Sequence, residues 1–144
     1  MAQRKSVPLI KKLDLFRCRI IRKQLMQRYC IHCYELASIG LGLQIVHPMS
    51  IAISYCEIGE NFRIYQNCTV GAKKKSVCGK EDSPVIGNNV TMYASSLIIG
   101  PVHVHDDVQL AANSCLVSDA TKPGLYTGTP AVYHETKEKW GGSY

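Results

Sequence analysis

The feature that most constrains the fold is a run of apolar residues with a period of six. Aliphatic side chains recur at this spacing from Ile39 to Ile51 and, in a shifted phase, from Ile58 to Val70. After an interruption, the spacing continues without a break to Leu116. Neither a helix, with about 3.6 residues per turn, nor an alternating strand, with a period of about 2, keeps such a pattern. The positions are Ile39, Ile45, Ile51, Ile58, Ile64, Val70, Ile86, Met92, Ile98, Val104, Leu110 and Leu116.

Each hexad is predicted to form one short strand followed by a tight corner. The corners need unusual backbone angles, and residues such as Gly40, Gly59 and Asn61 tolerate them. Three strands close a triangular coil, in which the aliphatic residue and the small or apolar fifth residue of each hexad point inward. We therefore predict an all-β solenoid, a left-handed parallel β-helix of about four coils, preceded by an α-helical segment.

The chain is predicted to have three parts: a basic helical arm (residues 1–35), the β-helix domain (36–132) and a C-terminal tail (133–144). The interruption at 71–84, GAKKKSVCGKEDSP, is polar and basic and is predicted to be a loop that projects from one corner. A long loop in a regular solenoid usually has a function. Because the ends of the prism leave strand edges and apolar surface uncovered, we expect the helix and the tail from Pro123 to cap them.

The positive charge of the chain belongs to the N-terminal arm. Residues 1–30 contain nine Lys and Arg residues and one acid, Asp14, whereas the net charge of the whole chain is +6. Apolar residues such as Leu9, Leu13 and Phe16 recur at helical spacing. The basic face of this helix either faces solvent or lies on an anionic membrane. Nucleic acid is not an expected partner, because no aromatic residues alternate with the basic ones to stack on bases.

Cysteine usage and hydropathy indicate a cytoplasmic protein, with the inner face of the membrane as the alternative location if the arm binds lipid. The seven cysteines form no even disulfide framework. No run approaches the roughly 18 apolar residues of a membrane span, and the basic start is not followed by the apolar segment of a secretory signal. Cys30, His32 and Cys33 resemble half of a zinc site, but no second pair matches them, so no metal is expected.

Four segments of the chain together resemble the hexapeptide-repeat acetyltransferases, within them the serine acetyltransferase-like branch that includes polysaccharide O-acetyltransferases. The segments are GLGLQIVHPMSIAIS at 40–54, IGENFRIYQNCTVGA at 58–72, SPVIGNNVTMYASSLIIG at 83–100 and GTPA at 128–131. The resemblance implies a homotrimer that binds acetyl-CoA as co-substrate in a cleft between neighbouring prisms. It also implies that His47 is the catalytic base.

The chemistry of an imidazole suits this role. A hydroxyl is a poor nucleophile at neutral pH, and an unperturbed imidazole has a pKa of about 6.5, which suits a general base. His47 is the third residue of the hexad that begins at Ile45, so its side chain is predicted to face outward. The alternative is an exposed histidine with only a structural role. His103 and His105 share one strand face, but without an apparent third ligand they are interpreted as surface residues.

Coenzyme A suggests further candidates. Its pantetheine arm fits extended backbone beside small residues, and its phosphates need Lys or Arg. The candidates for the arm are Gly71, Ala72, Tyr93, Ala94, Ser95 and Ala112, and those for the phosphates are Lys73 and Lys122. The lysines at 73–75 are equally consistent with a solvated loop.

The chain departs from serine acetyltransferases where those enzymes hold the amino acid. The family pattern has an Asp before the catalytic His and an Arg-His pair before the Pro of the PVIG-like coil, whereas this chain has Val46, Asp82 and Ser83. We therefore predict an O-acetyltransferase acting on a sugar or polysaccharide precursor. The alternatives are a serine acetyltransferase and a non-catalytic β-helix used for binding or scaffolding.

Overall fold

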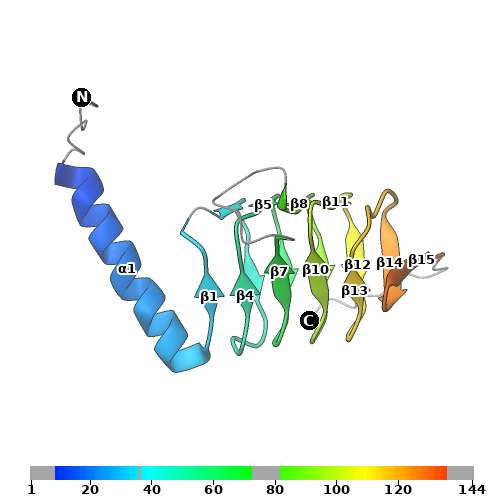
Figure 1. Cartoon of the computed structure of the whole chain (residues 1–144), viewed down its shortest axis with the longest axis horizontal. Helices are drawn as coiled ribbons and strands as arrows, with labels where there is room; N and C mark the ends of the chain where they lie inside the picture. Colours follow the sequence, from blue (N-terminus) through cyan, green and yellow to red (C-terminus); the bar gives the residue numbers. More distant parts are fainter. Residues whose placement is uncertain (1–8, 36, 73–81, 136–144) are drawn as a thin grey trace.

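The computed structural model describes residues 9–35, 37–72 and 82–135. One helix, α1 (Leu9–Tyr29), precedes a parallel β-solenoid of about four turns, which confirms the predicted fold class. The solenoid is an elongated stack of short strands, and α1 extends away from its N-terminal end (Figure 1). No described helix is long and apolar enough to cross a bilayer.

The short strands form three sheets, and each turn of the chain adds one strand to each sheet in the order five-, four- and six-stranded. The five-stranded sheet contains β1 (His32–Cys33), β4 (Ala52–Ile53), β7 (Thr69–Gly71), β10 (Leu97–Ile99) and β13 (Cys115–Leu116). The four-stranded sheet contains β2 (Ser38–Ile39), β5 (Glu57–Ile58), β8 (Val85–Ile86) and β11 (His103–Val104). The six-stranded sheet contains β3 (Gln44–Ile45), β6 (Arg63–Ile64), β9 (Thr91–Met92), β12 (Val108–Leu110), β14 (Gly124–Gly128) and β15 (Ala131–His134).

The core is built from columns of side chains that stack from coil to coil. In the six-stranded sheet, Ile64, Met92 and Leu110 lie in register and are fully buried. The fifth residues of the hexads also point inward, as predicted, and even the polar Ser96 and Ser114 are only 0% and 2% exposed. Since every coil repeats the same inward positions, each buried side chain contacts the coils on both sides of it.

Glycines pack most tightly at the corner between the four- and six-stranded sheets. A Cβ atom on Gly40 would lie 2.6 Å from the carbonyl carbon of Gly59, and one on Gly59 would lie 2.8 Å from that of Gly87. The same corner contains Asn61 and Asn89, each with a φ of 56°, and their side chains hydrogen-bond at 3.1 Å. The corner residues that the sequence singled out are therefore needed for close packing and for left-handed backbone.

The two ends of the solenoid are covered differently. At the C-terminal end, β15 turns back antiparallel to β14, and Tyr126 and Ala131 are buried there, so the tail is a cap as expected. At the N-terminal end, α1 packs on the core through the half-buried Leu25. Leu43 and Ile45 of the first coil remain exposed, which means that the helix covers only part of this end.

The register corrects one detail of the six-residue pattern. Ile53, rather than Ile51, lies beside Val70 in the five-stranded sheet, and Ile51 takes the inward position of a fifth residue. The corner between Ile45 and Ile51 therefore contains five residues (46–50), whereas the next coil has three (65–67) between Ile64 and Cys68. The loop that the sequence predicts follows β7, but its residues 73–81 lie outside the described part of the chain.

Candidate functional site

His47 lies in the extended corner that joins β3 to β4. Its side chain is exposed, as the hexad position predicted. The carbonyl of His47 accepts a hydrogen bond of 2.8 Å from the backbone N–H of Met49, which closes a tight turn around Pro48. Ser50, with a φ of 52°, occupies the left-handed position that Asn67 occupies in the next coil. The extra residues of this corner are therefore the ones that carry the imidazole.

A short aromatic column supports the imidazole. The rings of His47 and Tyr65 lie edge to face, with centroids 5.9 Å apart and planes at 70°. Tyr65 in turn lies 5.3 Å from Tyr93, centroid to centroid. We call His47, Tyr65 and Tyr93 the aromatic column. Sequence reasoning missed Tyr65, although it directly follows a buried aliphatic residue of the six-stranded sheet, as Tyr93 does.

Neither of the two nearest candidates in the sequence for an acid that orients His47, Glu35 and Glu57, contacts its imidazole. Glu35 accepts a 3.5 Å hydrogen bond from Arg22 of α1. Glu57 lies on β5 of the four-stranded sheet, whereas His47 follows β3 of the six-stranded sheet. Within the described residues, the imidazole of His47 has a ring partner in Tyr65 and no hydrogen-bonding side chain.

The residues predicted to bind coenzyme A fall on three different edges of the prism. Tyr93, Ala94, Ser95 and Ala112 lie on the edge between the six- and five-stranded sheets, which is also the edge of His47. Gly71 and Ala72 lie on the edge between the five- and four-stranded sheets. Lys122 precedes β14, on the third edge, and its ammonium lies 5.6 Å from the ring centroid of Tyr133. Lys73 lies outside the described residues. One chain therefore does not bring the whole set together.

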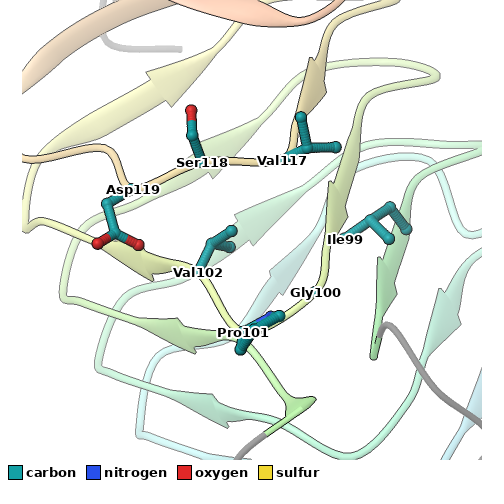
Figure 2. A pocket seen from close by; sticks show the side chains of 7 residues that line it. All are labelled: Ile99, Gly100, Pro101, Val102, Val117, Ser118 and Asp119. Carbon is teal, nitrogen blue, oxygen red and sulfur yellow. The ribbon is translucent and has the colours of Figure 1, made fainter.

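A pocket of about 390 Å³ opens on the edge that contains Gly71. Figure 2 shows that its lining comes from two segments, one that begins at the end of β10 and one after β13. The N–H of Gly100 donates a 2.8 Å hydrogen bond to the carbonyl of Gly71, so this predicted residue adjoins the pocket. The lining residues are Ile99, Gly100, Pro101, Val102, Val117, Ser118 and Asp119, none of which was predicted from the sequence.

Asp119 links this pocket to one of the surface histidines. Its carboxylate accepts a 2.8 Å hydrogen bond from the backbone N–H of His103, and the His103 ring nitrogen Nδ1 lies 3.9 Å away. Across the described residues, no three His, Cys, Asp or Glu side chains are arranged to hold a metal ion. Burial, and secondarily the neighbouring Cys33, raises the pKa of the Cys56 thiol to about 12, so this thiol is not a nucleophile at neutral pH.

Known proteins with similar sequences are serine acetyltransferases. The serine acetyltransferase of Helicobacter pylori is 38% identical over 108 residues, which make up 74% of this chain and 59% of the relative. This chain thus spans little more than half the length of that protein. No family model matches the chain.

Several solved structures with the same fold are also serine acetyltransferases. The crystal structure of the Neisseria gonorrhoeae serine acetyltransferase superposes with a TM-score of 0.75 at 23% identity, covering 84% of this chain and 46% of that one. A serine acetyltransferase in complex with CoA superposes with a TM-score of 0.71 at 21% identity, covering 86% of this chain and 50% of that one. At such identities the superpositions establish the fold, and the sequence match establishes the kinship. The chain therefore belongs to the serine acetyltransferase-like hexapeptide-repeat β-helix acetyltransferases.

Proposed function

We propose that the protein is a CoA-dependent O-acetyltransferase in which His47 is the general base. The observation that carries the proposal is the position of His47, exposed in an irregular corner of an otherwise regular prism whose relatives are acetyltransferases. The imidazole takes the proton of the acceptor hydroxyl while the oxygen of that hydroxyl attacks the thioester carbonyl. A C–O bond forms, the C–S bond breaks, and the CoA sulfur leaves and is protonated.

L-serine is the first acceptor to consider, because the relatives named above are serine acetyltransferases. A sugar hydroxyl is the second candidate, and the polysaccharide assignment has no support from the relatives. What favours the sugar is the side-chain chemistry around the site. Val46, beside His47, presents an exposed apolar surface, Ser83 is buried, and Asp82 is negative where the family pattern has a positive Arg. These three residues therefore do not reproduce the pattern of charges with which the family holds an amino acid.

The proposed active site is shared between two copies of the chain. His47 and the pocket that includes Gly100 lie at opposite borders of the five-stranded sheet, so a single chain separates the base from the pocket. A cyclic trimer juxtaposes one border of each prism with the other border of the next. We propose that residues 36–132 form this transferase unit, with acetyl-CoA held between neighbouring prisms.

The first test is acetyl transfer by the purified protein. CoA thiol release from acetyl-CoA is followed with L-serine and, separately, with a panel of sugars and nucleotide sugars as acceptors. His47→Ala should lower kcat by about 100-fold or more, the usual contribution of a general base. His134→Ala is the matched control, because His134 is exposed on β15 and belongs to no proposed site. Full activity in His47→Ala would refute the assigned role.

The products separate the acceptors. O-acetylserine as the product supports the serine assignment, and an acetylated sugar with no O-acetylserine supports the second candidate. A protein that neither binds CoA nor transfers acetyl groups would be a binding or scaffold β-helix instead.

Subunit mixing tests the shared site. His47→Ala and Ser118→Trp, which obstructs the pocket, should each be inactive alone. If the subunits are dissociated and reassembled together, some interfaces combine an intact base with an intact pocket, and activity should return. A mixture that stays inactive despite forming mixed trimers would argue that the site lies within one chain.

A further inference from the structure

The N-terminal end of the molecule carries several apolar side chains that the described residues leave exposed. Phe16 on α1 is 62% exposed and Leu41 on the first coil is 81% exposed. The N–H of Ser50 donates a 3.0 Å hydrogen bond to the carbonyl of Tyr29, which ties the corner of the first coil to the end of α1. We call the set the N-terminal surface: Phe16, Ile20, Ile21, Met26, Tyr29, Leu41, Leu43 and Ile45.

Helix geometry keeps part of this surface away from the solenoid. Leu25 is the side chain of α1 that packs against the core. Phe16 lies nine positions earlier, which is about two and a half turns, and therefore on the opposite face of the helix. Ile20, one turn after Phe16, extends the same stripe. Figure 1 shows the body of α1 standing apart from the sheets, so no sheet covers this stripe.

The charges around the stripe have one sign. Arg19 and Lys23 lie next to Phe16 and Ile20 at three-residue spacing and are exposed. Arg17 is exposed on the other side of the stripe, whereas Arg22 is engaged with Glu35. From Ala37 to Cys56, a stretch that includes β2 and β3 of the first coil, no Asp, Glu, Lys or Arg occurs. The N-terminal surface is thus apolar, with a basic border on α1. The acid of the first coil, Glu35, pairs with Arg22.

We propose that this end of the protein docks on an anionic lipid bilayer. An interfacial helix inserts its apolar side chains about 5–10 Å into the headgroup region, while basic side chains stay at the level of the phosphates. The positive border complements anionic headgroups. A second copy of the same surface fits less well, because pairing would bring two strongly basic helices together. Since His47 belongs to the first coil, docking would also bring the proposed base close to the membrane surface.

Vesicle flotation with the full chain tests the proposal without relying on acetyl transfer. The protein should float with vesicles that contain phosphatidylglycerol and remain behind with pure phosphatidylcholine. Each basic side chain brought to an anionic surface contributes roughly fivefold to partitioning. Arg19→Gln with Lys23→Gln should therefore weaken binding by roughly 25-fold, and added salt should weaken it further. Arg63→Gln, an exposed arginine on β6, is the charge control and should bind as the parent does.

The apolar stripe needs its own pair of variants. Phe16→Ser with Ile20→Ser should abolish flotation, whereas Val132→Ser, 55% exposed on β15 at the opposite end, should not change it. Far-UV circular dichroism checks that α1 is retained. Equal binding to neutral and anionic vesicles would overturn the proposal. So would an absence of binding combined with self-association that the Phe16 and Ile20 variants abolish, because a second copy would then cover this surface.

Discussion

The imidazole of His47 packs edge to face on the ring of Tyr65, 5.9 Å away and at 70°. The contact joins the irregular corner of the first coil to the regular corner of the second. It matters because the corner of His47 has two more residues than its neighbours, and longer corners have more backbone freedom. Tyr65 therefore limits where the imidazole can point.

This relationship predicts a role for the Tyr65 ring in positioning the base. Tyr65→Ala should lower kcat by up to about tenfold, since an edge-to-face aromatic pair contributes about 0.5–1.5 kcal/mol. Tyr65→Phe keeps the ring and should keep the activity. Steady-state kinetics with acetyl-CoA and the active acceptor provide the measurement. Equal losses in both variants would mean that the hydroxyl of Tyr65, rather than its ring, is what matters.

The glycine corner predicts a site that cannot accept a side chain. In Gly59→Ala the new Cβ would lie 2.8 Å from the backbone carbonyl of Gly87, and neither coil can move without disturbing its neighbours. The free energy of unfolding should fall by about 1–3 kcal/mol. Gly71→Ala is the control, because its Cβ would meet the flexible end of Ile99 at 3.1 Å and the Thr69 methyl at an ordinary 3.7 Å, and no backbone atom. Urea denaturation compares the two variants.

The columns of the core predict a strong contrast between an inward leucine and an exposed one. Leu110 is fully buried between coils, so Leu110→Ala should cost about 2–5 kcal/mol of unfolding free energy. Leu41 lies on the uncovered N-terminal surface, and Leu41→Ala should change stability by less than about 0.5 kcal/mol. Thermal denaturation of both variants is the check. A large loss in Leu41→Ala would indicate that something covers this residue in solution.

Cys56 predicts how stability falls at alkaline pH. Burial raises its pKa in the folded protein from 9.0 to about 12, so the folded state holds the proton more tightly than the unfolded state. The resulting stabilisation is complete below about pH 9 and is lost as the pH rises toward about 12. Cys56→Ala should lessen this alkaline loss relative to the parent. Urea midpoints measured from neutral to alkaline pH show it, with Cys18→Ala, at an exposed thiol, as the control.

Sequence reasoning succeeded where the structure depends on local, repeated rules. The six-residue spacing predicted inward positions such as Met92 and Leu110, and both are fully buried. It also predicted the outward orientation of His47. It failed at Ile51, because an extra pair of residues in a corner changes the register without breaking the apolar spacing. It also missed Tyr65 and the pocket at Gly100, since these depend on which side chains of successive coils meet.

The sequence by itself therefore determined the architecture of each coil and the stacking of the coils. A hexad specifies one strand and one corner, and burial of its two inward residues requires stacking, so the solenoid follows from the repeat. Tertiary structure decided how the coils align and what lies at the edges. In the folded chain, Ile53 pairs with Val70 and the ring of Tyr65 packs against His47. Phe16 lies on the face of α1 opposite Leu25. These relationships join residues in different coils or on different faces, and a six-residue period carries no information about them.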